Sequence, residues 1–200
     1  MTTPRADALA WAEGGTRLFL DELSRVGDDR FAAPTSLPGW STAHLVAHVH
    51  FNAQALRRLV SWAATGVESP MYSSPEQRAK EIEEGALLAP AELRDLVAGS
   101  ASALSEDLAA LSDRAWDAVV VTAQGRTIPA SQIPWLRARE VMVHAVDLGA
   151  GLTFADLPAD FTAELLADVV RKRAAGGEGP ALAAWLTGRP VSPPALGPWL

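Results

Sequence analysis

The chain has 200 residues, a net charge of −7, 48% hydrophobic residues and no cysteine. The negative charge and scattered arginines argue against a nucleic-acid surface, and the lack of cysteine excludes disulfides, thiolate metal ligands and a cysteine nucleophile. No apolar run approaches the ~18 residues of a membrane span and the N-terminus lacks the features of a signal peptide, so we expect a cytosolic protein without membrane contact.

Cap and turn residues divide the first half of the chain into helices. A first helix begins at Pro4 and ends at Gly27, because proline suits a first turn and glycine suits an end. A loop over 28–40, broken by prolines, leads to a second helix that Ser41 caps and Gly66 ends. A helix capped in this way is predicted with well-defined bounds.

The second predicted helix carries three histidines. His44 and His48 share an apolar face with Phe51, whereas His50 lies opposite and is predicted to be at the surface. A lone histidine on an apolar face is usually a core residue, but a pair spaced i, i+4 is able to bind a metal by itself. Both His44 and His48 therefore remain candidate ligands on spacing alone.

Helical periodicity continues beyond the second helix. It begins again at Pro75 and at Pro90, and the second of these segments runs to Leu111. Residues 118–128 have the alternation of a short β-hairpin, with Gly125 in the turn. An isolated hairpin is only marginally stable, so we expect it to pack on the helices.

Residues 133–149 predict a helix of about four turns, with Pro134 in its first turn and Gly149 at its end. Polar residues three or four apart form one narrow stripe along it: Arg137, Glu140, His144 and Asp147. Apolar residues flank this stripe, so we expect Glu140 and His144 to be buried together.

The last quarter of the chain predicts two more helices and a tail. One helix begins at Pro158 and is broken by the glycines of 176–179. A short helix over 180–187 follows, and then an extended, proline-rich tail over 190–200. With short connections between its helices, the chain predicts a mainly α fold: an antiparallel four-helix bundle with a short β-hairpin before the fourth helix and a small C-terminal helical appendage.

A buried carboxylate beside a buried imidazole costs several kcal/mol unless its charge is compensated. One compensating group is a metal ion held by His48, Glu140 and His144, whose two imidazoles and one carboxylate leave an open position as in catalytic zinc sites. The same set suits non-haem iron. The alternative is a buried ion-pair network that only fixes packing. Residue types alone leave both interpretations open.

Several segments resemble one family. Residues 37–48 (LPGWSTAHLVAH) and 135–148 (WLRAREVMVHAVDL) are similar to two signatures of the DinB-like, mycothiol-dependent maleylpyruvate isomerase family. Softer similarity covers 71–78 (MYSSPEQR) and 184–189 (AWLTGR), together with the LGPWL ending. The resemblance spans nearly the whole chain.

The resemblance implies a ligand set of His48, Glu140 and His144, because the family's ligand histidine comes eight residues after the tryptophan of its first signature. His44 then lines the pocket or is structural. The implied cofactors are Zn²⁺, or another divalent metal, and mycothiol. The implied reaction is the cis–trans isomerisation of maleylpyruvate to fumarylpyruvate in aromatic degradation, by reversible addition of an activated external thiolate.

A dicarboxylate substrate needs cations to bind it. The resemblance favours Arg78 and Arg189 as the catalytic arginines. Asp147 is a candidate for orienting a ligand. The further candidates for binding substrate or thiol are Arg137, Arg139, Tyr72 and His44.

Two rival functions remain at this point: a mycothiol S-transferase acting on another electrophile, and a metal-binding or ligand-binding protein without turnover. The resemblance also implies two domains, with a metal-binding bundle over 1–152 and a reduced form of the family's C-terminal domain over 153–200. The protein is expected to be a monomer or a homodimer.

Overall fold

The computed structural model describes residues 3–189 and 192. The chain divides into two compact units, Met1–Phe154 and Ala155–Leu200. Most of the expected extended tail, including the LGPWL ending, lies outside the described residues. None of the helices among the described residues is both long enough and apolar enough to cross a membrane.

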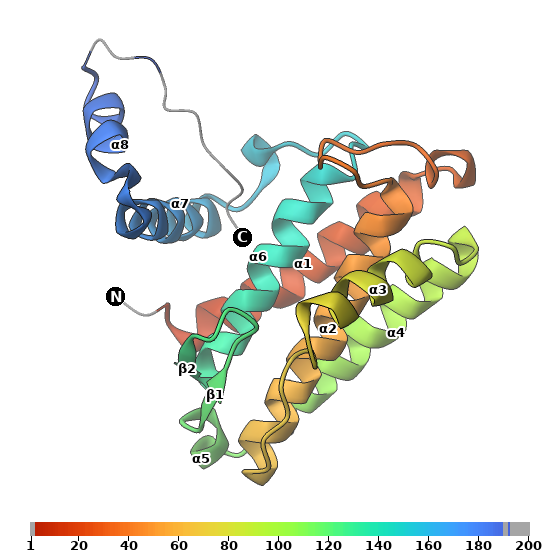
Figure 1. The fold of residues 1–200 in the computed structure, drawn as a ribbon, viewed down its shortest axis with the longest axis horizontal. Coiled ribbons are helices and arrows are strands. Elements are labelled where there is room, and N and C mark those ends of the chain that lie inside the picture. Colours follow the sequence, from red (N-terminus) through yellow and green to blue (C-terminus); the bar gives the residue numbers. More distant parts are fainter. Residues whose placement is uncertain (1–2, 190–191, 193–200) are drawn as a thin grey trace. The chain divides into compact units, whose positions relative to one another are not determined.

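The first unit is a helical bundle with one small hairpin, which confirms the expected mainly α fold (Figure 1). Its α-helices are α1 (Arg5–Arg25), α2 (Thr42–Thr65), α3 (Pro75–Gly85), α4 (Pro90–Ala109), α5 (Asp113–Trp116) and α6 (Ile133–Asp147). Its remaining elements are the 3₁₀ turns η1 (Asp28–Arg30), η2 (Ala130–Gln132) and η3 (Phe154–Asp156), and the strands β1 (Val119–Val121) and β2 (Thr127–Pro129), with η3 at the boundary between the units.

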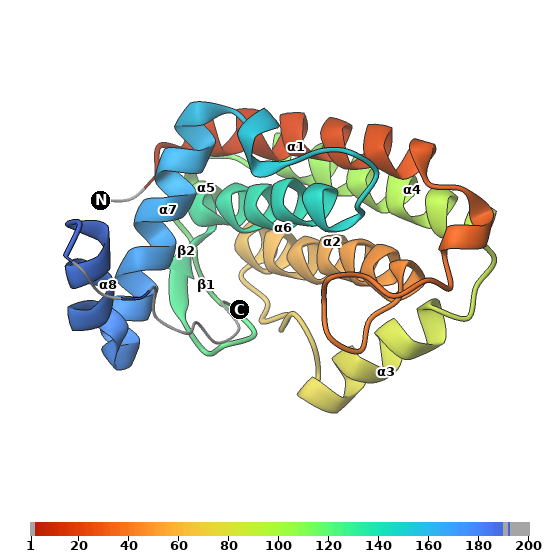
Figure 2. The ribbon, with the colours of Figure 1, turned by 90° about the horizontal axis from the view of Figure 1, so that it is seen from above.

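The long helices of the bundle run up, down, down and up in chain order. Helices α1 and α6 run in the same direction, as do α2 and α4, and the two pairs pack antiparallel (Figure 2). The expectation of an antiparallel bundle did not include these parallel pairs. They are possible because α3 forms a crossover between α2 and α4, whereas a short loop would have reversed the chain direction.

Helix α2 lies at the centre of the bundle and begins and ends where its sequence predicts. The Ser41 hydroxyl accepts a hydrogen bond from the His44 amide, and Gly66 ends the helix at φ 75°. Residues on almost every side of α2 are buried, because α3, α4 and α6 all pack on it.

The prediction that His50 lies at the surface was wrong. His50 is only 7% exposed, and its Nδ1 lies 2.9 Å from the Leu96 carbonyl oxygen of α4. Helical periodicity correctly placed His50 on the face of α2 opposite His48. That face is not open to solvent, because α4 packs on it. A helix surrounded by neighbours has no solvent side for a wheel to identify.

The hairpin is confirmed, and it pairs Val120 with Ile128 in antiparallel register. Gly125 has φ 74° in the turn, where a side chain would be strained. Val120 and Ile128 are buried in one apolar cluster with residues of α2 such as Leu56. The hairpin is therefore stabilised by packing on the bundle. This packing was expected, because an isolated two-stranded hairpin is only marginally stable.

The second unit contains α7 (Ala159–Arg173), a π-helical turn η4 (Ala174–Glu178) and α8 (Gly179–Leu186). Gly177 breaks the helix at φ 94°, in the glycine-rich segment expected to break it. Arg173 Nη1 lies 2.9 Å from Glu178 Oε2 across this turn. A single turn thus joins the two helices of this unit.

Helix α1 approaches α6 closely because Gly15 has no side chain at their crossing. A β-carbon built on Gly15 would lie 2.7 Å from Val141 Cγ2 and 2.8 Å from Met142 Cγ. Both distances are too short for carbon atoms in contact, so one of the helices would have to move. The neighbouring Gly14 has its nearest such atoms at 3.9 Å, which is ordinary van der Waals contact.

We predict opposite effects from alanine at these two adjacent glycines. Gly15→Ala overpacks the α1–α6 crossing and should lower the free energy of unfolding by about 1–3 kcal/mol. Gly14→Ala should raise it by up to about 1 kcal/mol, because alanine favours the helix and fits the space. Denaturant unfolding followed by circular dichroism measures both changes, and equal stability of the two variants would contradict the close approach.

Candidate metal centre

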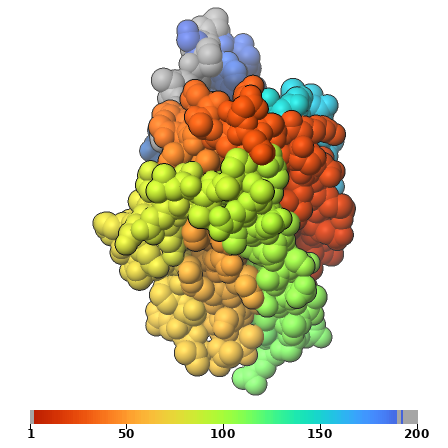
Figure 3. Space-filling model, turned by 90° about the vertical axis from the view of Figure 1, so that its right-hand side faces the viewer, coloured from red at the N-terminus to blue at the C-terminus, as the bar shows by residue number. Residues whose placement is uncertain are grey.

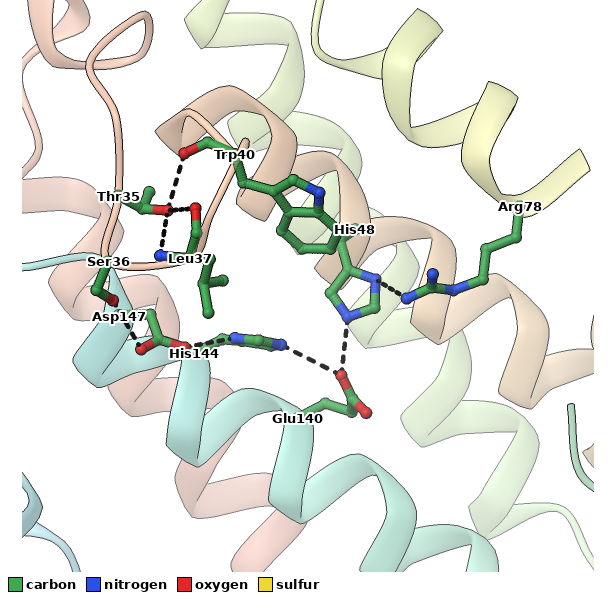
Figure 4. Close-up of polar contacts among 9 residues, drawn as sticks. All are labelled: Thr35, Ser36, Leu37, Trp40, His48, Arg78, Glu140, His144 and Asp147. Carbon is green, nitrogen blue, oxygen red and sulfur yellow. Dashed lines mark hydrogen bonds and ion pairs between the residues drawn. The ribbon is translucent and has the colours of Figure 1, made fainter. Parts of the chain in front are cut away.

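Three predicted ligands converge between the antiparallel helices α2 and α6. His48 projects from α2 toward Glu140 and His144, which lie one turn apart on α6 (Figure 4). His48 Nε2 is 2.9 Å from Glu140 Oε2, and His144 Nε2 is 3.4 Å from the same oxygen. The ring centroids of the two histidines are 5.1 Å apart and nearly perpendicular. Both imidazoles thus direct Nε2 toward one carboxylate.

The three side chains are almost completely buried, with exposed fractions of 5% for His48, 8% for Glu140 and 6% for His144. Burial favours the neutral carboxylic acid, but hydrogen bonds from His144 and His48 outweigh it and hold the pKa of Glu140 well below its usual range. Burial also lowers the pKa of His48, which is therefore neutral near pH 7. A neutral imidazole and an ionised carboxylate are the forms that bind metals.

His144 differs from His48 because it has a second acidic partner. Burial works against its charge, but the hydrogen bonds and negative charges of Asp147 and Glu140 raise the pKa of His144 to about 9. Its Nδ1 lies 2.8 Å from Asp147 Oδ2. Asp147 therefore fixes the ring orientation and keeps the proton on Nδ1, which leaves Nε2 to face Glu140.

The loop before α2 holds Asp147 and covers the site, which the sequence did not predict. Ser36 donates a hydrogen bond of 3.4 Å to Asp147 Oδ1, and the Thr35 hydroxyl donates one of 2.9 Å to the Trp40 carbonyl (Figure 4). The Trp40 ring lies 5.1 Å from the His48 ring, measured between centroids. The family-like spacing of Trp40 and His48 was a usable signal for this ring contact. No local pattern links Ser36 to Asp147, which are far apart in the sequence.

Arg78 reaches His48 from α3 on the other side. Its Nη2 lies 3.4 Å from His48 Nδ1, the ring nitrogen that faces away from Glu140 (Figure 4). The Arg78 guanidinium also lies 6.0 Å from the ring centroid of Tyr72, and burial raises the pKa of the Tyr72 hydroxyl. Two of the predicted substrate residues, Arg78 and Tyr72, thus lie beside the three candidate ligands.

The other candidates have different surroundings. His44 belongs to the N-terminal cap of α2, where its Nδ1 lies 2.6 Å from Ser41 Oγ and its Nε2 lies 3.3 Å from Glu83 Oε2. Arg139 is buried, with its guanidinium 5.9 Å from the Trp135 ring centroid. These contacts favour structural roles for His44 and Arg139.

The hydrogen bonds of Arg137 and Arg189 go to groups other than the three candidate ligands. Arg137 Nη1 donates hydrogen bonds of 2.9 Å to the Val49 carbonyl and to Asn52 Oδ1 on α2. Arg189 is exposed in the second unit, where its Nη1 donates to the Thr187 carbonyl at 2.8 Å. Binding of substrate by either arginine stays a prediction.

The three converging side chains fit a divalent metal ion. One ligand atom from each of His48, Glu140 and His144 lies within 4.8 Å of the others, and all three residues are buried. An ion between them would receive two imidazole nitrogens and a carboxylate oxygen, and Asp147 would orient one of the imidazoles. A set of three protein ligands leaves room for one exogenous ligand.

Comparison with known proteins identifies the family of the chain. The family described as "Mycothiol maleylpyruvate isomerase N-terminal domain" matches residues 5–149. A crystal structure of the mycothiol-dependent maleylpyruvate isomerase has 43% sequence identity and a TM-score of 0.84, covering 88% of this chain and 75% of its own. A mutant of that enzyme with one histidine replaced by alanine gives 43% identity and a TM-score of 0.82, over 85% of this chain and 72% of its own. No curated protein matches. The chain therefore belongs to the mycothiol-dependent maleylpyruvate isomerase family.

Proposed function

We propose that the protein is a mycothiol-dependent isomerase that converts maleylpyruvate to fumarylpyruvate. The observation that carries this proposal is the convergence of His48, Glu140 and His144 in a chain with 43% identity to an enzyme of that activity. Isomerising a cis double bond requires temporary single-bond character, which reversible addition of a thiolate creates. Since the chain has no cysteine, the thiol must come from outside the chain, and the family indicates mycothiol.

We propose Zn²⁺ as the metal held by His48, Glu140 and His144. Held by these three side chains, the ion would leave one position open for an exogenous thiol and would supply the positive charge that favours its thiolate at neutral pH. The negative charge of Glu140 is then compensated by the ion rather than by a protonated His144. Burial of the three side chains keeps water from competing for the site.

Arg78 is the residue that we propose for holding a substrate carboxylate. A neutral histidine that gives Nε2 to a metal carries its proton on Nδ1, so His48 Nδ1 no longer accepts a hydrogen bond from Arg78. The Arg78 guanidinium, now 3.4 Å from that nitrogen, then becomes available to an incoming carboxylate. Tyr72 is proposed to hydrogen-bond the same substrate, because burial keeps its hydroxyl protonated at neutral pH.

The second unit is proposed to be a reduced form of the family's C-terminal domain. Its helices α7 and α8 are joined by the single turn Ala174–Glu178, where larger family members are expected to carry several strands. Arg189, which follows α8, is the candidate of this unit for substrate binding. The proposed role of Arg78 does not depend on Arg189.

We predict that the purified protein binds close to one zinc ion per chain after zinc is supplied, as measured by elemental analysis. His48→Ala, Glu140→Ala and His144→Ala should each lose most of this zinc, because two protein ligands hold the ion poorly. His44→Ala is the matched control, since His44 lies on the same helix as His48 and contacts Ser41 and Glu83 instead. A wild type without zinc, or zinc loss only in His44→Ala, would contradict the assignment.

Zinc binding should release a proton from His144. In the metal-free protein His144 is protonated below about pH 9, and a histidine must lose that proton from Nε2 to bind a metal. The apparent zinc affinity should therefore rise by about tenfold per pH unit between pH 7 and 8. Titration calorimetry in two buffers of different ionisation enthalpy measures the protons released.

Asp147→Asn is the control for this proton release. Removing the Asp147 charge lowers the pKa of His144, so this variant should release fewer protons at pH 8 than the wild type. Zinc affinity that is independent of pH in the wild type would show that His144 is already neutral.

With maleylpyruvate and mycothiol, we predict formation of fumarylpyruvate while the free thiol concentration stays constant. Chromatography of the products and a thiol assay measure both quantities. Arg78→Lys should lower kcat/KM by about tenfold or more, because lysine cannot form a bidentate pair with a carboxylate. Arg94→Lys is the control, since Arg94 pairs with Asp28. Consumption of the thiol would identify an S-transferase, and no turnover would leave a binding protein.

A further inference from the structure

A sizeable cavity in the first unit is separate from the proposed metal ligands. It has a volume of about 710 Å³ and lies between α1 and α4, with Trp116 and Arg137 completing its lining. Figure 3 shows the face on which α1 and α4 reach the surface side by side. None of the three proposed metal ligands lines this cavity.

Arg137 supplies a buried positive charge to this cavity. Its side chain is only 2% exposed, and both of its hydrogen bonds within the described chain come from Nη1. Its Nε is buried without a hydrogen-bond partner among the described residues. An unsatisfied, charged N–H donor is costly to bury, so a negative charge close to this guanidinium would stabilise it.

The rest of the lining would suit an anion with an apolar body. It contains three arginines, Arg5, Arg17 and Arg137, against the single acid Glu13, so its net charge is +2 in a chain of −7. The walls between these charges are mostly apolar, with Leu9 on α1 facing Leu104 on α4. Burial also lowers the pKa of Arg137 to about 10, which leaves its charge present at neutral pH.

The shape of the cavity limits the size of the ligand. Its lining follows α1 from Arg5 to Leu20, a distance of about 22 Å along a helix. Arg137 lies near the middle of this length, since α1 and α6 run in parallel with Trp11 beside Trp135 and Gly15 beside Val141. A head group at Arg137 therefore leaves about 11 Å of apolar groove on either side for a tail.

We propose that the α1–α4 cavity is a binding site for a small amphipathic carboxylate. The carboxylate pairs with the guanidinium of Arg137, which lines the cavity and whose two hydrogen bonds in the described chain both come from Nη1. The hydrocarbon part lies between α1 and α4 against Leu104 and Leu108. This site differs from the proposed active site in its residues and in its ligand, because maleylpyruvate is a short dicarboxylate without an apolar tail.

Octanoate is a suitable probe, with 1-octanol as its uncharged counterpart. Titration calorimetry of the full-length protein should show saturable octanoate binding and at least about tenfold weaker binding of 1-octanol. Arg137→Met should weaken octanoate binding by about tenfold or more. Because this variant also leaves Asn52 without its partner, Ala101→Phe provides a second test: Ala101 lines the cavity, and a phenyl ring there fills it while Arg137 stays intact.

Two control variants test whether octanoate binds in this cavity and independently of the metal ligands. Ala91→Phe adds the same ring to an exposed position of α4 that does not line the cavity, and it should bind octanoate as the wild type does. His48→Ala should also bind octanoate normally, even though it is expected to lose zinc, so failure of the proposed enzymatic function leaves this test unaffected. The proposal is overturned by absence of saturable binding, by equal binding of octanoate and 1-octanol, or by unchanged binding in Ala101→Phe.

Discussion

Burial of the ionised Glu140 carboxylate between α2 and α6 is the constraint on which the rest of the structure depends. Removing such a group from water costs several kcal/mol unless donors or positive charges surround it. Here His144 lies one turn away on α6, and His48 approaches from α2 at 2.9 Å. This contact fixes the register of the two antiparallel helices, because a shift by a single residue would turn His48 away from Glu140.

The loop before α2 and the helix α3 surround the site formed by His48, Glu140 and His144. The loop before α2 places Ser36 against Asp147 and the Trp40 ring against His48. The crossover helix α3, which permits α2 and α4 to run in parallel, also carries Arg78 to the outer nitrogen of His48. Helix α3 thus has two effects: it allows the parallel arrangement of α2 and α4, and it brings the positive charge of Arg78 to the site.

Helix α6 carries two buried charges of opposite sign three residues apart, Arg137 and Glu140. Their side chains contact different parts of the structure. Glu140 faces His48 and His144, whereas Arg137 contacts Asn52 and lines the α1–α4 cavity. Burial lowers the pKa of Arg137 to about 10, and the negative charge of Glu140 opposes this shift, so each group favours the charged form of the other. This mutual stabilisation, together with the contacts that Arg137 makes to α2, explains how the bundle accommodates a buried arginine that has no carboxylate within ion-pair distance in the described chain.

The sequence by itself determined the helices, the hairpin and the polar stripe of α6, because caps, turn glycines and periodicity are local signals. It also predicted burial of Glu140 with His144, since apolar residues flank them. Spacing did not separate His44 from His48, and the separation required the family signature. Only the tertiary structure decided that His50 is buried, that Arg137 bonds to α2 and lines a cavity, and that Ser36 holds Asp147. These depend on which helices surround α2 and α6, and such long-range packing leaves no periodic pattern in the chain.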